Sequence, residues 1–219
     1  MTGDDGDLRP PHAGPTALPR PPPAAETRGT TKRIVVLGGG TGGTLAANRL
    51  LRALADDPDE VVITVVDRDD DHIYQPGLLF VPFGLARPED LVRSRPAQLH
   101  DGIVYRTAEI ERVNLDAQHV QLSGGVTLVY DVLVVASGAR LVPGETEGLT
   151  GSGYRETVHN FYDLDGAVAL DRALSGFTGG RLVVNVVDMP IKCPVAPLEF
   201  CFLADWYFTE RGIRDQVEL

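Results

Sequence analysis

The chain has 219 residues, a formal net charge of −11 at pH 7 and two cysteines. This length can bury a sizeable core and suits one or two domains. The acidic balance, with no block of Lys or Arg, argues against a nucleic-acid partner or an anionic-lipid surface. Two cysteines do not make a disulfide framework, and no apolar run approaches the roughly 20 residues needed to span a bilayer, so a cytoplasmic, reducing location is expected.

The first segment, residues 1–31, is rich in Pro, Gly, Asp and Thr and contains the run P-R-P-P-P-A-A. Such a composition cannot bury enough apolar surface to order itself, and it predicts a disordered tail that acts as a spacer.

A dinucleotide-binding fingerprint follows. The apolar run at 33–37 leads into G-G-G-T-G-G, then into a helical pattern at about 42–55 and a second apolar run at 61–66 that ends in Asp67. Gly38, Gly40 and Gly43 fit G-x-G-x-x-G, with an acid at the expected distance. Gly38 permits the tight turn, Gly40 lets backbone approach a pyrophosphate, and Gly43 lets the helix pack closely. A purely structural glycine turn is the alternative, but strand, helix and acid together favour dinucleotide binding.

The next hundred residues indicate which dinucleotide. A mostly irregular stretch at 71–84 is followed by short strands that predict an antiparallel meander over 108–129. Tyr130 to Arg140, Y-D-V-L-V-V-A-S-G-A-R, adds a buried strand at 132–136 and a turn of small residues. Together these resemble the flavoproteins with two dinucleotide-binding domains, whose first domain binds FAD. The resemblance implies an α/β fold: a Rossmann-type FAD-binding domain over 32–147, whose C-terminal return is expected to be missing, and over 148–219 the beginning of a second Rossmann-like domain that carries the loop with Cys193.

The same resemblance implies the cofactor contacts. Gly40, Thr41 and Gly42 would hold the FAD pyrophosphate, Asp67 the adenosine ribose, Ile110 the adenine through its backbone, and Ala136, Ser137 and Gly138 the rest of the cofactor. Ser137 stands where Thr is commoner in the family.

The stretch D-H-I-Y-Q-P-G-L, from Asp71, resembles the flavin-side loop of sulfide:quinone oxidoreductases and type II NADH dehydrogenases. From the residues alone, Tyr74 and Pro76 would simply pack under the sheet, and His72 would be a loop histidine. No histidine shows a spacing typical of metal ligands.

A loop at 187–197, V-D-M-P-I-K-C-P-V-A-P, follows a run at 181–187 that predicts a buried strand of the second domain. In NADH-using relatives a second glycine fingerprint follows that strand. Here the loop has no glycine, and Pro190, Pro194 and Pro197 remove N–H donors, so the sequence predicts that the NADH site is lost.

Cys193 lies in this loop, beside Lys192 and just before a predicted helix that runs from about 194 or 196 to Gly212. Both neighbours favour a thiolate; a small buried residue in a tight loop is the alternative. K-C-P-V-A-P resembles the segment that carries an active-site cysteine in sulfide:quinone oxidoreductases, which favours a catalytic Cys193. Cys201, further along the helix, is predicted to be a core cysteine.

The resemblance implies a mechanism with two cysteines, of which Cys193 would be one: one takes the sulfur of sulfide as a persulfide, and the other attacks the flavin as a thiolate. Two electrons pass to FAD and on to a membrane quinone, at the inner face of the cell membrane. That second cysteine and the membrane-binding segments belong to the C-terminal third of the family, so we expect this chain to be truncated and inactive alone. Three alternatives stay open: a type II NADH dehydrogenase, a sulfide dehydrogenase that reduces a cytochrome, and a non-enzymatic FAD-binding or thiol-sensing protein.

Overall fold

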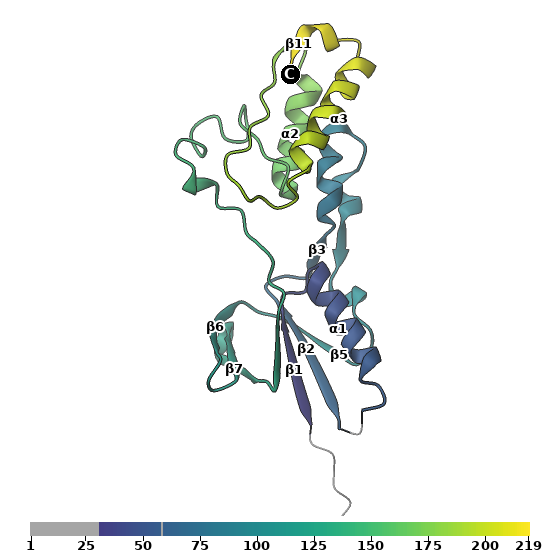
Figure 1. Cartoon of the computed structure of the whole chain (residues 1–219), viewed down its shortest axis with the longest axis vertical. Coiled ribbons are helices and arrows are strands. Elements are labelled where there is room, and N and C mark those ends of the chain that lie inside the picture. The colour runs from purple at the N-terminus through teal and green to yellow at the C-terminus, as the bar shows by residue number, and fades with distance from the viewer. Residues whose placement is uncertain (1–30, 58) are drawn as a thin grey trace, which may run out of the picture.

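The computed structural model describes residues 31–57 and 59–219, so the predicted tail at 1–31 lies outside the described residues apart from Thr31. The described residues form two lobes, one above the other along the longest axis (Figure 1). The lower lobe holds a parallel sheet, helix α1 and the meander, and the upper lobe holds helices α2 and α3.

The sheet of the lower lobe has the strand order β5-β2-β1-β9, and all its neighbours are parallel. Its strands are β1 (Lys32–Leu37), β2 (Val61–Asp67), β5 (Ile103–Thr107) and β9 (Val132–Val135). The predicted strands at 33–37, 61–66 and 132–136 are therefore confirmed as members of one parallel sheet. Among the described strands, β9 has a neighbour on one side only.

Both faces of this sheet are covered, and the alternation along β1 shows how. Ile34 and Val36 pack in a core that includes Ala47 of α1 (Thr41–Ala53). Val35 and Leu37 pack on the other face, against the meander. The meander is antiparallel, as predicted, and consists of β6 (Ile110–Asn114), β7 (His119–Leu122) and β8 (Val126–Val129).

The stretch predicted to be mostly irregular, 71–84, leaves the lower lobe and becomes part of the upper core (Figure 1). The antiparallel pair β3 (Asp71–Ile73) and β4 (Val92–Ser94) connects the lobes. Between them lie three 3-10 turns, η1 (Gln75–Leu79), η2 (Val81–Phe83) and η3 (Pro88–Leu91). Leu79 and Phe83 pack with α2 (Leu164–Gly176) and α3 (Ala196–Glu210). The domain boundary expected at 147 stays a prediction. Apolar residues of 75–91 belong to the hydrophobic core of the upper lobe, which they share with α2 and α3.

Helix α3 begins and ends as its sequence predicts. Pro197 stands in its first turn, where a missing N–H costs nothing, and Gly212 follows its end with φ of +68°. Helix α2 is capped by Asp163, whose carboxylate accepts a hydrogen bond from the N–H of Gly166 at 2.6 Å. Among the described residues, no helix combines the length and hydrophobicity that crossing a bilayer requires.

The prediction of a buried strand at 181–187 is wrong. Strand β10 comprises only Gly180–Arg181, which pairs in parallel with β11 (Val217–Glu218). Beyond it, Val183 is 70% exposed and Val187 54% exposed. Among the described residues the pairing extends only as far as Leu182, whose N–H donates to the carbonyl of Glu218 at 2.9 Å. The remaining short turns are η4 (Pro96–Gln98), η5 (Ser123–Gly125), η6 (Pro143–Glu145) and η7 (Arg214–Gln216).

A Gly43→Ala substitution should destabilise the lower lobe, because a Cβ there would lie 1.8 Å from the carbonyl oxygen of Gly38. We expect the free energy of unfolding to fall by about 2–3 kcal/mol, as overpacking does. The matched control is Gly42→Ala, whose Cβ would meet nothing within 4 Å and should be neutral or slightly stabilising. Urea denaturation of the protein without cofactor measures both, and equal effects would contradict this account.

Candidate functional site

The glycine turn between β1 and α1 packs tightly at Gly38 and Gly43, whereas Gly40 and Gly42 lie at an opening. Gly38 has φ of +102°, and a Cβ on it would lie 2.3 Å from the carbonyl oxygen of Ala136. Gly40 and Gly42 face open space. Helix α1 has no side-chain cap at Gly40 and no acidic residue in its first turn, so its free N–H groups point at this opening. The cradle therefore fits a pyrophosphate.

Asp67, at the end of β2, holds the glycine turn in place. Its Oδ2 accepts a hydrogen bond from the N–H of Gly39 at 2.7 Å, and its Oδ1 accepts one from the N–H of Arg68 at 2.8 Å. The carbonyl of Asp67 also accepts a hydrogen bond from the N–H of Ala108 at 2.8 Å. This bond brings the start of the meander, and Ile110 with it, to the same end of the sheet.

Ala136, Ser137 and Gly138 follow β9 directly and lie against the glycine turn. The N–H of Ala136 donates to the carbonyl of Leu37 at 2.8 Å, and the site of a Cβ on Gly38 lies 2.8 Å from the Cα of Ser137. The structure thus gathers the predicted cofactor residues at the carboxyl ends of β1, β2 and β9. That is where ligands bind in open α/β sheets.

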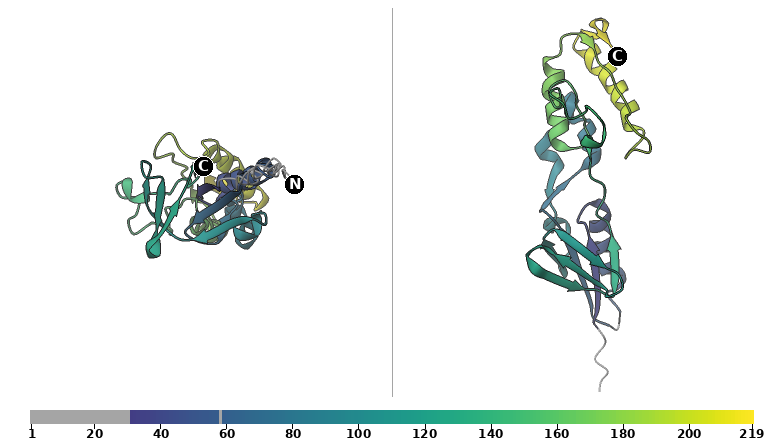
Figure 2. Two further views of the ribbon diagram at one scale, coloured as in Figure 1. Left: turned by 90° about the horizontal axis from the view of Figure 1, so that it is seen from below. Right: turned by 90° about the vertical axis from the view of Figure 1, so that its left-hand side faces the viewer.

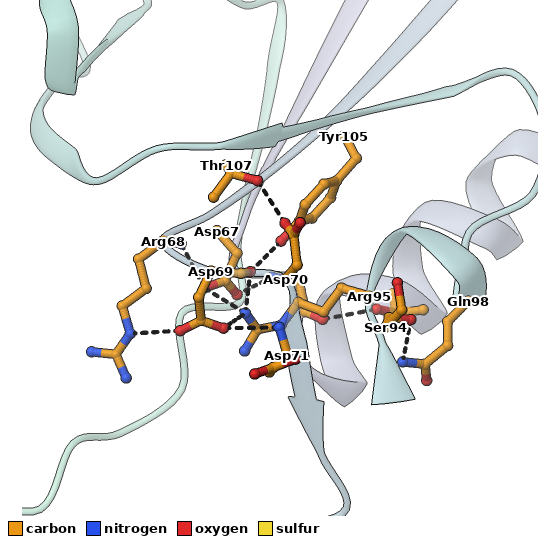
Figure 3. A network of polar contacts seen from close by, with 12 residues as sticks. Asp67, Arg68, Asp69, Asp70, Asp71, Ser94, Arg95, Gln98, Tyr105 and Thr107 are labelled. Carbon is orange, nitrogen blue, oxygen red and sulfur yellow. Dashed lines mark hydrogen bonds and ion pairs between the residues drawn. The ribbon is translucent and has the colours of Figure 1, made fainter. Parts of the chain in front are cut away.

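A network around Arg95 completes this end of the sheet (Figure 3). Nη1 of Arg95 lies 3.2 Å from Oδ1 of Asp67, donates to the carbonyl of Asp69 at 2.5 Å and pairs with the Asp69 carboxylate. The hydroxyl of Tyr105 donates to the same carbonyl at 2.5 Å. Sequence reasoning missed Arg95 and Tyr105, because only the pairing of β3 with β4 returns Arg95 to the end of β2.

Arg95 pairs with two carboxylates of the network, those of Asp67 and Asp69. Burial alone would raise the pKa of Asp69, but the Arg95 guanidinium and hydrogen bonds outweigh it, and the pKa lies below its ordinary value. Burial raises the pKa of Tyr105, against the effect of Arg95. Asp69 therefore stays ionised at neutral pH and shares with Asp67 the charge of Arg95.

Cys193 is exposed and lies in the other lobe, in the loop before α3. Its φ is +53°, a left-handed conformation that residues other than glycine rarely adopt. The N-terminal end of α3, and with it this loop, faces the lobe that holds the glycine turn (Figures 1 and 2). Lys192 donates from Nζ to Oε1 of Gln75 at 2.8 Å, and the hydroxyl of Tyr162 donates to the carbonyl of Cys193 at 3.4 Å.

Three predicted environments differ from the structure. Cys201 is only partly buried, because the inward face of α3 is formed by Phe200, Ala204 and Phe208, and it is not a core cysteine. His72 is buried on β3 rather than placed in a loop. Tyr74 is 56% exposed, so it does not pack under the sheet, and Pro76 is exposed as well.

Within the described residues, no group of three or more His, Cys, Asp or Glu side chains could hold a metal ion.

Comparison with known sequences identifies relatives of the chain. The family described as pyridine nucleotide-disulphide oxidoreductase matches residues 32–184. A mitochondrial sulfide:quinone oxidoreductase of Dictyostelium discoideum is 26% identical over 158 residues, which cover 72% of this chain and 35% of that protein. An NADH dehydrogenase-like protein of Mycobacterium tuberculosis is 36% identical over 81 residues, 37% of this chain and 19% of that protein.

Solved structures share the fold. The sulfide:quinone oxidoreductase of Aquifex aeolicus matches with a TM-score of 0.66 and 23% identity, over 85% of this chain and 42% of that one. Putidaredoxin reductase, in its covalent complex with putidaredoxin, matches with a TM-score of 0.55 and 26% identity, over 80% of this chain and 40% of that one. The chain thus spans about a third of the sulfide:quinone oxidoreductase sequence that it matches.

The glycine cradle, the acid that braces it and the turn after β9 agree with the α/β, Rossmann-type fold of these neighbours. Because the family match covers more than half of its residues, the chain belongs to the pyridine nucleotide-disulphide oxidoreductase family, a family of FAD-binding oxidoreductases.

Proposed function

We propose that the chain functions in an FAD-dependent oxidoreductase of the sulfide:quinone type. This enzyme would oxidise sulfide at Cys193 and pass the electrons through FAD to a quinone at the inner face of the membrane. The observation that carries this proposal is the loop before α3. It presents an exposed cysteine beside Lys192, and it contains no glycine between 187 and 197. The similarity to the Dictyostelium enzyme over 72% of this chain supports the same reading.

The residues around the glycine turn would hold the cofactor. The free N–H groups at Gly40, Thr41 and Gly42 would bind the pyrophosphate, and Asp67 would accept a hydrogen bond from the adenosine ribose. Ile110 would contact the adenine through its backbone, and Ala136, Ser137 and Gly138 would line the cofactor. Bound FAD would supply a two-electron acceptor.

Cys193 would act as the nucleophile, since the thiolate is the reactive form of cysteine. The Cys193 thiolate would form a sulfur–sulfur bond with hydrosulfide, which gives a persulfide and releases one proton and two electrons. FAD, held by the glycine-turn residues, would supply the acceptor for this electron pair, and a quinone that receives the pair with two protons would become a quinol. Cys201 is not assigned as the partner thiol, because it lies along α3, two turns beyond Cys193.

A second candidate is a type II NADH dehydrogenase activity, favoured by the 36% identity over 81 residues to the mycobacterial protein. The loop at 187–197 argues against it. Pro190, Pro194 and Pro197 offer no N–H groups, and no glycine allows close approach of a second pyrophosphate.

NADH and sulfide distinguish these candidates directly. In the full-length protein loaded with FAD, we expect sulfide to bleach the flavin absorbance in a stopped-flow experiment and NADH to leave it unchanged, because the loop at 187–197 offers no second nucleotide cradle. Rapid bleaching by NADH, with none by sulfide, would refute the sulfide:quinone activity and support a type II NADH dehydrogenase activity.

Replacing Cys193 by Ser should reduce the rate of sulfide-dependent flavin bleaching by at least about a hundredfold, since a hydroxyl is a poor nucleophile at neutral pH and forms no persulfide. FAD content should be unchanged, because the glycine cradle lies in the other lobe. Cys201→Ser is the matched control. Its partly buried position predicts a stability loss below about 1 kcal/mol and a normal rate. Near-normal bleaching in Cys193→Ser would refute the assigned role.

Asp67→Asn should weaken FAD binding about ten- to a hundredfold, which corresponds to the roughly 1.5–3 kcal/mol of a hydrogen bond to a charged group. Quenching of flavin fluorescence on titration measures the affinity. Asp116→Asn, in an exposed turn of the meander, makes the same charge change away from the cradle and should have no effect. If the two variants bind FAD with equal affinity, Asp67 does not contribute to FAD binding.

A further inference from the structure

Arg95 packs directly against the glycine turn, although it comes from the strand pair that connects the lobes. It follows β4, and its N–H donates to the carbonyl of Asp70 at 2.7 Å. A Cβ on Gly39 would lie 3.0 Å from Cδ of Arg95 and 3.3 Å from Cε2 of Tyr105. The middle glycine of G-G-G therefore rests on these two side chains, and a larger residue there would displace them.

The guanidinium group of Arg95 also contacts the Asp67 carboxylate (Figure 3). Nη1 lies 3.2 Å from Oδ1 of Asp67, and the two side chains are only 13% and 16% exposed. Oδ1 accepts a further hydrogen bond from the N–H of Arg68, whereas the only donor to Oδ2 among the described residues is the N–H of Gly39. Because a carboxylate oxygen has two lone pairs, Oδ2 keeps one acceptor position for a ligand, on the side of the glycine turn.

Stability alone does not explain why an arginine is buried here. Its Nε is buried and has no hydrogen-bond partner within the described part of the chain, and an unpaired buried donor costs stability. Replacing a buried ion pair by apolar side chains of similar volume is often neutral or stabilising. A role toward the ligand of the neighbouring cradle accounts for both the position and the cost.

We propose that Arg95 is a positioning residue for the cofactor: it holds the Asp67 carboxylate in the orientation in which Oδ2 accepts a hydrogen bond from the adenosine ribose of FAD. The proposal rests on the cofactor contacts proposed above, but not on the use of sulfide. Arg95 acts on FAD only through Asp67, so its effect on affinity must vanish when the carboxylate is removed.

The test is a double-mutant cycle of FAD affinity, measured by quenching of flavin fluorescence on titration. Arg95→Met should weaken FAD binding about fivefold or more, the usual size of coupling between residues in contact. In an Asp67→Ala background the same substitution should change the affinity by less than about twofold, because the side chain that Arg95 orients is gone. Arg95→Lys keeps the charge but not the planar fork, and its affinity should lie between those of the wild type and Arg95→Met.

Arg93→Met is the matched control. It removes an exposed arginine two positions earlier, whose Nη1 donates to the carbonyl of Val92, and it should leave FAD affinity unchanged. Equal weakening by Arg93→Met would indicate a general effect of charge and would overturn the proposal.

A purely structural role of Arg95 gives a different pattern. Arg95→Met would then weaken binding by the same factor with Asp67 and with Ala at that position; that result overturns the proposal, as does an unchanged affinity in Arg95→Met. If circular dichroism shows that Arg95→Met does not fold, Arg95→Lys takes its place in the cycle. A loss of affinity that Asp67→Ala abolishes then supports the proposal, and any other result overturns it.

The positioning role and the sulfide activity fail separately. A protein that shows the expected cycle but is not reduced by sulfide would refute the sulfide activity and keep the role of Arg95. Reduction by sulfide, combined with equal effects of Arg95→Met in both backgrounds, would refute the role of Arg95 alone. A wild-type protein that does not bind FAD would overturn both.

Discussion

The close approach of Gly43 to the carbonyl of Gly38 is the constraint on which the lower lobe depends. A side chain at Gly43 would push α1 away from the end of β1, and one at Gly38 would collide with the backbone of Ala136 and Ser137 after β9. With both absent, the helix N-terminus lies over the carboxyl ends of the strands, the N–H of Gly39 reaches Asp67, and the carbonyl of Ala136 closes against Gly38. Three strand ends and one helix end therefore meet at a single opening.

The segment from β3 to Arg95 connects this opening to the upper lobe. It first supplies Gln75, which accepts a hydrogen bond from Lys192 in the loop of Cys193, and later supplies Arg95, which pairs with Asp67. The apolar residues between them are buried with α2 and α3. One excursion of the chain thus supports both the cofactor cradle and the cysteine loop, although these lie in different lobes.

Sequence reasoning succeeded where the cause is local. The continuous apolar runs of the parallel strands, the glycine spacing and the proline and glycine at the two ends of α3 each determine their element within a few residues. It failed where partners are distant. Arg95, Tyr105 and Gln75 acquire their roles only through contacts across the fold. Burial of the apolar run at 181–187 likewise depends on distant partners, and of the described residues only the strand Val217–Glu218 pairs with its beginning. Cys201 and His72 were misplaced for a related reason: composition indicates that a residue can be buried, but only the packing of whole elements decides which face it takes.

Strand β9 has a consequence for how the molecule behaves in concentrated solution. In the described part of the chain it pairs with β1 alone, and Val132 and Val135 are 50% and 70% exposed. Such an edge is a template for intermolecular β-pairing. The net charge of −11 keeps molecules apart at low salt, but this repulsion is screened beyond about 10 Å at 0.1 M ionic strength. Self-association through this edge should therefore become stronger as salt is added, in contrast to contacts between opposite charges, which salt weakens.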